Sequence, residues 1–226
     1  MKVRFAALAV LTACLLAACQ VTPPIPMADD AAIQASHQKP VLLMSVTLRN
    51  DYMTAHQPKL DGLWVKRRDV GDRVRIAPDD VALTQSSPRG NTYLLRFALE
   101  PGNYLLDTLA SGAPVGRARG EFITRMYTSF KVPQSGVHYL GHVNATVRKR
   151  NDGETPAGPR TPIVEQEVVG AGSGTFDVVI SDRLAQDSAA FRKLNPGLKS
   201  RTVQKAILPP YDAARIKRIV DSGEAS

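Results

Sequence analysis

A long run of alternating residues in the second half of the chain constrains the fold more than any other feature. Between positions 137 and 148, one set of residues is apolar or small: Val137, Tyr139, Gly141, Val143, Ala145 and Val147. The set between them holds most of the polar residues: His138, Leu140, His142, Asn144, Thr146 and Arg148. A period of two is typical of a β-strand, whose side chains point alternately to opposite faces of a sheet. The sequence therefore predicts a long strand with one face turned toward a core.

Further strands are predicted along the chain from short apolar runs bounded by turn residues. Residues 41–48 form a short, mostly apolar run rich in branched side chains, which indicates a central strand that is buried on both faces. Shorter or weaker candidates are residues 60–68, 73–76, 175–180 and 203–208. Trp64, the only tryptophan, is interpreted as a core aromatic in preference to a ligand-stacking residue.

Two hairpins are predicted from turn chemistry. Apolar residues alternate with others in both 93–99 and 104–108. Glu100-Pro101-Gly102-Asn103 between them predicts a turn. A strand near 119–132 is followed by Pro133-Gln134-Ser135-Gly136 and then by the alternating strand. In both places we expect the two strands to pair with each other.

The rest of the chain predicts a long loop and two short helices. Residues 148–174 are punctuated by glycine and proline and form a loop with one weak strand at 163–169. Residues 183–194 have helical spacing after the cap residues Ser181 and Asp182, and residues 212–220 form a short amphipathic helix.

About eight short strands followed by small helices define the expected fold class. It is mainly β: an antiparallel β-sandwich or barrel-like domain with one or two short C-terminal helices. Residues 41–226 are expected to form a single β-rich domain.

The N-terminus has the form of a secretory signal peptide. Lys2 and Arg4 precede an apolar run over residues 5–16, which falls short of the ~20 residues that a membrane-spanning helix needs. An ordinary cleaved signal peptide and a transmembrane anchor are the alternatives. Residues 19–40 are rich in proline and predict a disordered or extended tether that could reach about 60 Å.

Leu16-Ala17-Ala18-Cys19 resembles the lipobox of bacterial lipoproteins. The resemblance implies removal of residues 1–18, a diacylglyceryl group on the sulfur of Cys19, and acylation of its new amine, with palmitate as a typical chain. Gln20 stands where an aspartate would favour inner-membrane retention, so the implied location is the outer membrane, facing the periplasm. Cys14 leaves with the signal peptide, so the mature domain has no cysteine for a disulfide.

Two further motifs extend this resemblance. They are Leu-Glu-Pro-Gly-Asn-Tyr at 99–104 and Val-Pro-x-x-Gly-Val-x-Tyr-Leu-Gly at 132–141. With the lipobox, they resemble a loose group of uncharacterised proteobacterial envelope lipoproteins, and also transthyretin-like and carboxypeptidase-regulatory-like sandwich modules. The resemblance implies a fold and a location, and no catalytic residues.

No motif in the sequence predicts catalysis, a metal or a cofactor. His138 and His142 would lie roughly 13 Å apart on a strand, too far to bind one ion. The glycines between 170 and 174 have neither the spacing of a dinucleotide loop nor that of a hydrolase elbow, and a flexible hairpin loop explains them.

Basic residues are the remaining candidates for a binding site. The net charge of +8 falls to about +6 when Lys2 and Arg4 are removed, which favours anionic partners in the envelope over nucleic acid. Three runs could converge into one anion-binding patch: Lys66-Arg67-Arg68, Arg117 with Arg119, and Arg148-Lys149-Arg150. Three separate solvated strand ends are the alternative.

These observations predict a lipid-anchored periplasmic β-sandwich without catalysis, which binds another envelope protein or an anionic envelope polymer. The alternative is an enzyme or enzyme accessory that acts on cell-wall glycan or peptide, with a site built from residues distant in sequence. The oligomeric state is open at this stage.

Overall fold

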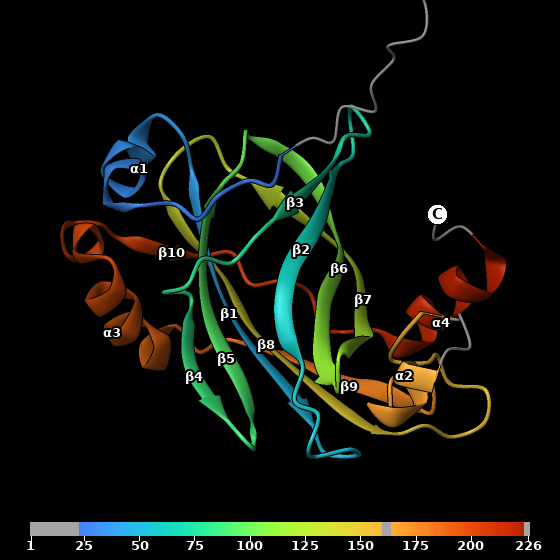
Figure 1. Cartoon of the computed structure of the whole chain (residues 1–226). Helices are drawn as coiled ribbons and strands as arrows, with labels where there is room; N and C mark the ends of the chain where they lie inside the picture. The colour runs from blue at the N-terminus through green and yellow to red at the C-terminus, as the bar shows by residue number, and fades with distance from the viewer. Residues whose placement is uncertain (1–22, 160–163, 224–226) are drawn as a thin grey trace, which may run out of the picture.

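The computed structural model describes residues 23–159 and 164–223, which fold into two sheets packed face to face (Figure 1). The six-stranded sheet contains β1 (Val41–Asn50), β4 (Leu83–Ser87), β5 (Gly90–Ala98), β8 (Val137–Lys149), β9 (Gly174–Ser181) and β10 (Val203–Lys205). The four-stranded sheet contains β2 (Lys59–Arg67), β3 (Arg73–Ile76), β6 (Gly102–Val115) and β7 (Ala118–Val132). The prediction of a mainly β fold is confirmed, in its sandwich form.

β1 is the central strand of the six-stranded sheet, as its mostly apolar sequence predicts. The order of that sheet is β10-β8-β1-β5-β4, and β9 also pairs with β8. β1 runs antiparallel to β5 and parallel to β8. Its first six residues are buried, because one face meets the second sheet and the other is covered by helices.

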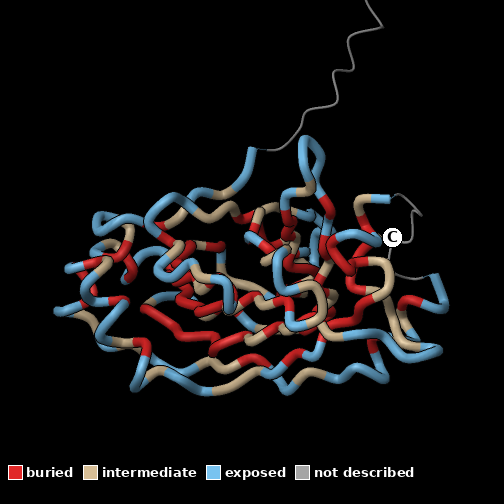
Figure 2. Tube along the Cα trace, turned by 60° about the horizontal axis from the view of Figure 1, so that its bottom comes forward, coloured by how far each residue is buried: buried red, intermediate tan, exposed pale blue. Residues whose placement is uncertain are grey.

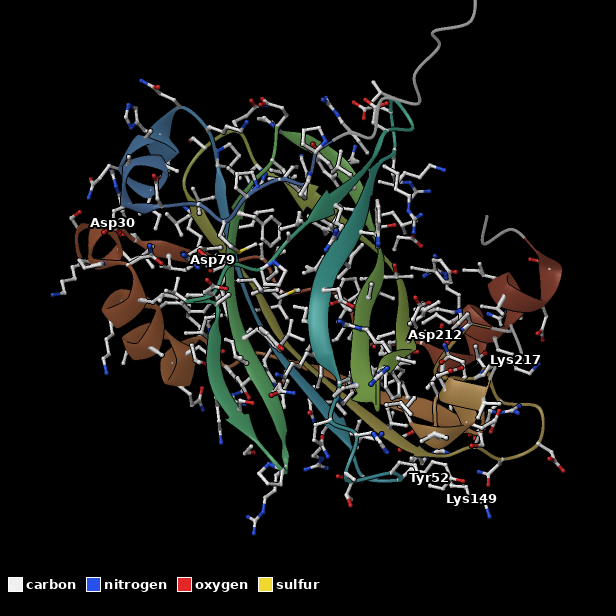
Figure 3. The ribbon with its side chains drawn as sticks, viewed as in Figure 1. Asp30, Tyr52, Asp79, Lys149, Asp212 and Lys217 are labelled. Carbon is white, nitrogen blue, oxygen red and sulfur yellow. The ribbon has the colours of Figure 1, made fainter. Side chains whose placement is uncertain are left out.

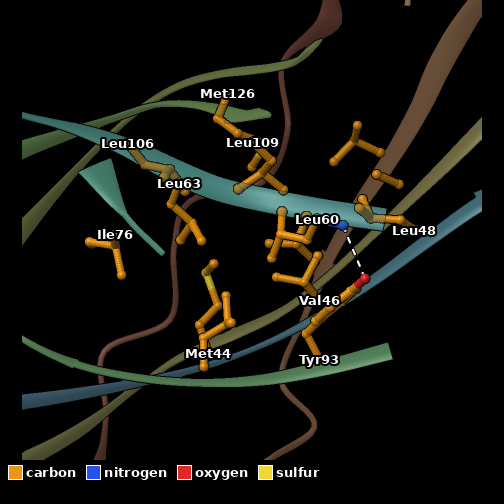
Figure 4. Packing of buried hydrophobic residues seen from close by; sticks show 14 of the residues in the cluster. Met44, Val46, Leu48, Leu60, Leu63, Ile76, Tyr93, Leu106, Leu109 and Met126 are labelled. Atoms are coloured by element: carbon orange, nitrogen blue, oxygen red, sulfur yellow. Dashed lines mark hydrogen bonds between the residues drawn. The ribbon is translucent and has the colours of Figure 1, made fainter. Parts of the chain in front are cut away.

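The core lies between the two sheets, and buried positions run through the middle of the chain trace (Figure 2). Met44 and Val46 of β1 belong to the same buried cluster as Leu63 and Leu109 of the four-stranded sheet (Figure 4). The backbone N–H of Leu60 donates a 3.0 Å hydrogen bond to the Tyr93 hydroxyl, which ties the sheets together across the core. Burial of this apolar surface is the main stabilising contribution to the fold.

Both predicted hairpins are wrong in their pairing, although their strands are present. β5 and β6 lie in different sheets, and so do β7 and β8. Residues 99–101 and 133–136 are therefore crossovers between the sheets. The reason is burial: Phe97 and Leu106 both belong to the core, which they enter from opposite sides. β6 instead forms a hairpin with β7 that turns at Gly116, whose φ of 56° favours glycine.

Short helices cover the outer faces of both sheets. The elements are α1 (Asp30–Gln34), the 3-10 turn η1 (Ala35–His37), α2 (Val164–Val168), α3 (Leu184–Leu194), the 3-10 turn η2 (Pro196–Ser200) and α4 (Ala213–Ser222). α1, α3 and η2 pack on the six-stranded sheet, and α4 packs on β7 of the other sheet (Figure 1). The helices predicted at 183–194 and 212–220 are confirmed.

The weak strand predicted at 163–169 is wrong, because residues 164–168 form α2. The buried Gln166 side chain accepts a hydrogen bond from the backbone N–H of Glu121 in β7, which holds this turn of helix against the sheet. Gly170 ends the helix in a left-handed conformation, with a φ of 78°. Residue 163 lies outside the described residues.

The segment before β1 packs against the sandwich over most of its described length, where the sequence predicts an extended tether. Ile25 forms a parallel bridge with Ile76, and the N–H of Ala28 donates to the carbonyl of Arg96. The Asp29 side chain caps α1 by accepting from the N–H of Ala32, and this anchors the helix start. Residues 1–22, with the predicted signal peptide and Cys19, lie outside the described residues.

Candidate functional site

A β-bulge in β8 decides which of its side chains reach the outer face of the six-stranded sheet. Leu43 pairs with Tyr139, but Ser45 pairs with His142, so β8 has one residue more than β1 between these pairs. Gly141 takes a φ of 107° at this point. The strict alternation predicted for 137–148 is therefore wrong across Gly141, and His142 joins Tyr139 on the face that α3 covers.

Five side chains meet beneath α3, and we call them the β8–α3 polar cluster: Ser45, Tyr139, His142, Arg183 and Asp187. The Tyr139 hydroxyl donates a 2.6 Å hydrogen bond to Asp187 Oδ2, and the Ser45 hydroxyl donates to the same oxygen. Ser45 Oγ lies 2.9 Å from His142 Nδ1. Arg183 Nη1 lies 3.3 Å from His142 Nε2, and its Nη2 lies 3.7 Å from Asp187 Oδ1.

The hydrogen bonds of this cluster fix its protonation. The Ser45 proton goes to Asp187, so His142 Nδ1 carries the hydrogen that Ser45 Oγ accepts. His142 Nε2 then has a lone pair for Arg183. Burial and the adjacent Arg183 charge lower the pKa of His142 to about 4, so the ring is neutral near pH 7. Burial and the bond to Asp187 raise the pKa of Tyr139.

The cluster has the residue types of a serine hydrolase in a different order. In a hydrolase, the histidine lies between the serine and the carboxylate, so that it can take the serine proton. Here the serine lies between the histidine and the carboxylate, and only 1% of its surface is exposed. This geometry suits the attachment of α3 to the sheet, and not nucleophilic attack by Ser45.

A cleft of about 240 Å³ lies beside α4, and we call it the α4 cleft. Its apolar lining includes Ile123, Phe176, Tyr211, Ala214 and Ile216, and its charged lining includes Arg125, Arg148, Glu154, Asp177 and Lys217. These residues come from β7, the end of β8, the loop after it, β9, the segment before α4 and α4 itself. Lys217 and Asp212 lie on and beside α4 (Figure 3).

Both signs of charge line the α4 cleft. Arg148 binds Glu154 at 2.6 Å and Asp177 at 3.0 Å, and its hydrogen bond holds the pKa of Glu154 at about 2. Arg125 donates to the backbone carbonyl of Pro156 at 2.8 Å. Burial raises the pKa of Tyr211 to about 12, so its hydroxyl remains a hydrogen-bond donor. The lining of the cleft therefore combines apolar side chains with hydrogen-bond donors and acceptors.

A second hollow, of about 410 Å³, lies on the outer face of the four-stranded sheet next to α4. Trp64 is half-buried there, and the guanidinium of Arg73 lies 4.5 Å from its ring centroid. Arg73 also pairs with Asp107 at 2.7 Å. Trp64 thus stacks on a cation of this chain at the edge of a hollow, and does not lie in the central core that the sequence predicts.

α4 docks on a strained position of β7. Tyr127 has a φ of 41°, which is rare for a residue other than glycine, next to a register shift between β6 and β7. Ile216 and Val220 of α4 pack on Tyr127, and Arg215 donates a 2.8 Å hydrogen bond to its carbonyl. This small contact joins the helix to the sheet, with hollows on both sides of it.

The first basic run lies at the opposite end of the sandwich from the other two. In the register of β2 with β6, Arg67 lies opposite Tyr104, near the start of β6. The first run therefore lies where β2 turns into β3, and we call this end of the sandwich the hairpin end. Arg117 and Arg119 lie around the β6–β7 turn, at the opposite end of the same sheet. The third run closes β8 at that opposite end, where Figure 3 labels Lys149.

Much of this charge is paired within the chain. Arg67 pairs with Asp69 at 2.9 Å, Arg119 pairs with Asp61 at 2.6 Å, and Arg148 is bound by its two carboxylates. A single anion-binding patch made from all three runs is therefore excluded by their placement.

Searches of protein families, curated proteins and solved structures each found no match to this chain. Among residues 23–159 and 164–223, no three histidine, cysteine or acidic side chains gather to hold a metal ion. In the same part of the chain, each helix is too short or too polar to cross a bilayer.

Ser45, Asp187 and the α4 cleft are not predicted by any sequence pattern considered above. Asp187 lies three residues after Leu184 and four before Phe191, on the buried face of α3. An acidic residue at that spacing on an amphipathic helix signals a buried polar partner. No comparable signal marks the cleft, because its lining comes from distant segments.

Proposed function

We propose that this protein is a lipoprotein of the outer membrane, anchored through Cys19, whose sandwich binds another envelope protein in the periplasm without catalysis. The α4 cleft is the proposed binding site. The lipobox at residues 16–19 is the single observation that carries the anchoring part of this proposal.

The α4 cleft supports a protein segment as the occupant. A peptide presents apolar side chains together with backbone hydrogen-bond donors and acceptors. The cleft has an apolar lining together with the charged side chains of Arg148, Glu154 and Asp177. An anionic polymer would instead favour a continuous cationic surface, whereas the first basic run lies at the other end of the sandwich from the second and third, and several of these cations are paired with carboxylates.

The alternative is an enzyme or enzyme accessory that acts on cell-wall glycan or peptide. Ser45, His142 and Asp187 are the group that would favour it. Their order is wrong for proton transfer from serine to histidine, and Ser45 is buried. A binding function is therefore the better account of the site.

The chain offers a matched test of anchoring, because it contains two cysteines. Cys19→Ser should release the protein from the membrane fraction and abolish incorporation of labelled palmitate, since the acyl acceptor is lost. Cys14→Ser lies within the signal peptide and should leave both unchanged. Palmitate labelling that survives in Cys19→Ser would overturn the assignment.

A further inference from the structure

The path of the chain into the fold orients the sandwich relative to Cys19. Ile25 forms a parallel bridge with Ile76 of β3, and its N–H donates a 2.7 Å hydrogen bond to the carbonyl of Arg75. In a parallel bridge, residues before Ile25 run beside residues before Ile76, toward the start of β3. The described chain therefore begins near the hairpin end (Figure 1).

The linker between Cys19 and the first residue that pairs with the sandwich is short. Ile25 follows Cys19 by six positions, and a fully extended chain of that length spans at most about 22 Å. Val70, in the β2–β3 turn, lies six residues before Ile76, so it can be about as far from the Ile25–Ile76 bridge as Cys19 is. β6, with 14 residues, is about 46 Å long, so the opposite end of the sandwich lies well beyond that reach.

The hairpin end carries an apolar tip among basic side chains. Val70 is 58% exposed in the β2–β3 turn, and Lys66 and Arg68 are exposed beside it. Two carboxylates lie in the same connection: Asp69, which is held by Arg67, and Asp72, which is exposed. An exposed apolar residue flanked by cations fits the interface of an anionic bilayer, where both kinds of group gain contacts.

A hollow of about 560 Å³ adjoins this tip. Arg68, Asp69, Asn103, Ser129 and Lys131 contribute polar lining, and Arg68 Nη1 donates a 2.8 Å hydrogen bond to Ser129 Oγ. Two exposed cations beside amide and hydroxyl groups suit a phosphodiester headgroup. The hollow therefore lies at the end of the sandwich where headgroups would be present.

We propose that the hairpin end is a membrane-contacting surface, in which Val70 enters the interface of the bilayer and Arg68 and Lys131 bind an anionic phospholipid headgroup. This inference rests on the proposed lipid anchor at Cys19. It assigns the opposite end of the sandwich to the periplasmic side, away from the membrane.

The mature chain allows a direct test, because it contains no cysteine except Cys19. Val70→Cys and Asp152→Cys would each carry a fluorophore at exposed positions, in the β2–β3 turn and in the loop after β8 respectively. The full lipidated protein is reconstituted in phosphatidylglycerol vesicles that contain a headgroup spin label as quencher. We expect severalfold stronger quenching at position 70 than at position 152. Equal quenching, or the reverse order, would overturn the inference.

Charge reversal tests the headgroup site with a matched control. Arg68→Glu with Lys131→Glu should reduce the quenching at position 70 in phosphatidylglycerol vesicles to its level in phosphatidylcholine vesicles. Arg117→Glu with Lys149→Glu makes the same charge change at the opposite end of the sandwich. This pair should leave the quenching at position 70 unaltered. An equal effect of both pairs would contradict a headgroup site. Mass spectrometry of the acyl chains separates the two proposals: an unlipidated chain overturns both, and a lipidated chain without the position-70 signal overturns only this one.

Discussion

The two sheets of the sandwich are covered by helices in different ways. α3 lies over the six-stranded sheet, where Phe191 is buried against Tyr139 and Asp187 joins the β8–α3 polar cluster. α4 lies over the four-stranded sheet through Ile216 and Val220, on a small contact around Tyr127. Hollows adjoin α4, one of them the α4 cleft.

The difference indicates which part of the surface can adapt to a ligand. Regions with few buried contacts open at lower free energy than regions with many, and binding surfaces are drawn from the first group. α3 is held by apolar packing and by the buried hydrogen bonds of Asp187, whereas α4 is joined to the sheet through a small apolar cluster and a hydrogen bond from Arg215 to the Tyr127 carbonyl. We therefore expect α4 to be the adjustable side of the molecule.

The largest effect is expected for Phe191→Ala. Phe191 is 1% exposed, and its ring meets Tyr139 edge to face at a centroid distance of 6.3 Å. Loss of the ring should lower the free energy of unfolding by about 4 kcal/mol, because a cavity is left under α3. Urea unfolding measures this change, with the exposed neighbour Arg192→Ala as control. A loss below about 1 kcal/mol would mean that α3 is not held by packing.

Asp187→Ala should have the next largest effect, about 3 kcal/mol. The substitution leaves the hydroxyls of Tyr139 and Ser45 buried without their acceptor. Asp182→Ala removes the exposed carboxylate at the start of the same helix, which accepts from the N–H of Leu184. It should lower the stability much less than Asp187→Ala does, because this carboxylate is exposed and water can replace its hydrogen bonds. Similar losses for the two variants would argue against a structural role for the β8–α3 polar cluster.

Ile216→Ala should cost about 2 kcal/mol, the low end for such a truncation, because the cluster around it is small. Hydrogen exchange should show faster exchange of the α4 amides and unchanged exchange in α3. Ile219, which is only partly buried, provides the control Ile219→Ala with a smaller effect. Faster exchange in both helices would show that the two covers open together.

The smallest effect is expected from pH. The folded-state pKa of His142 is about 4, below the ordinary value of 6.5, so below pH 6.5 the unfolded chain takes up a proton that the folded chain does not. Stability should therefore fall by about 1 to 2 kcal/mol between pH 7 and pH 5. The stabilisation from Glu154, with its pKa near 2, is lost only below pH 4.5.

Urea unfolding of His142→Gln across this range is the check. The variant should lose the pH dependence between 7 and 5, whatever its stability at neutral pH. An identical pH slope in the variant and the original chain would remove His142 from this account.

Most strands and the two C-terminal helices could be predicted from sequence because periodicity is a local property, but β4, a short and largely polar strand, is not predicted. The neighbour of each strand in the sheet could not be predicted in this way. A turn such as Glu100-Pro101-Gly102 fits a hairpin and a crossover equally well, and only burial of Phe97 and Leu106 in one core decides between them. Turn chemistry alone therefore predicts the wrong neighbours.

The bulge in β8 limits prediction of the site in the same way. Gly141 within an alternating run is a signal for a bulge, but the side chains that change face depend on the register with β1. The position of His142 beside Ser45 follows from that register. The α4 cleft depends on β7, β9 and α4 coming together, which no local pattern specifies.

The most direct test of the central claim compares the two helical covers as binding surfaces in intact cells. A photo-crosslinking residue is placed at Ala214, in the α4 cleft, or at Ala189, exposed on α3. We predict one reproducible adduct with an envelope protein from position 214 and none from position 189. Adducts from position 189 alone, or the same adducts from both positions, would contradict the assignment of the α4 cleft as the binding site.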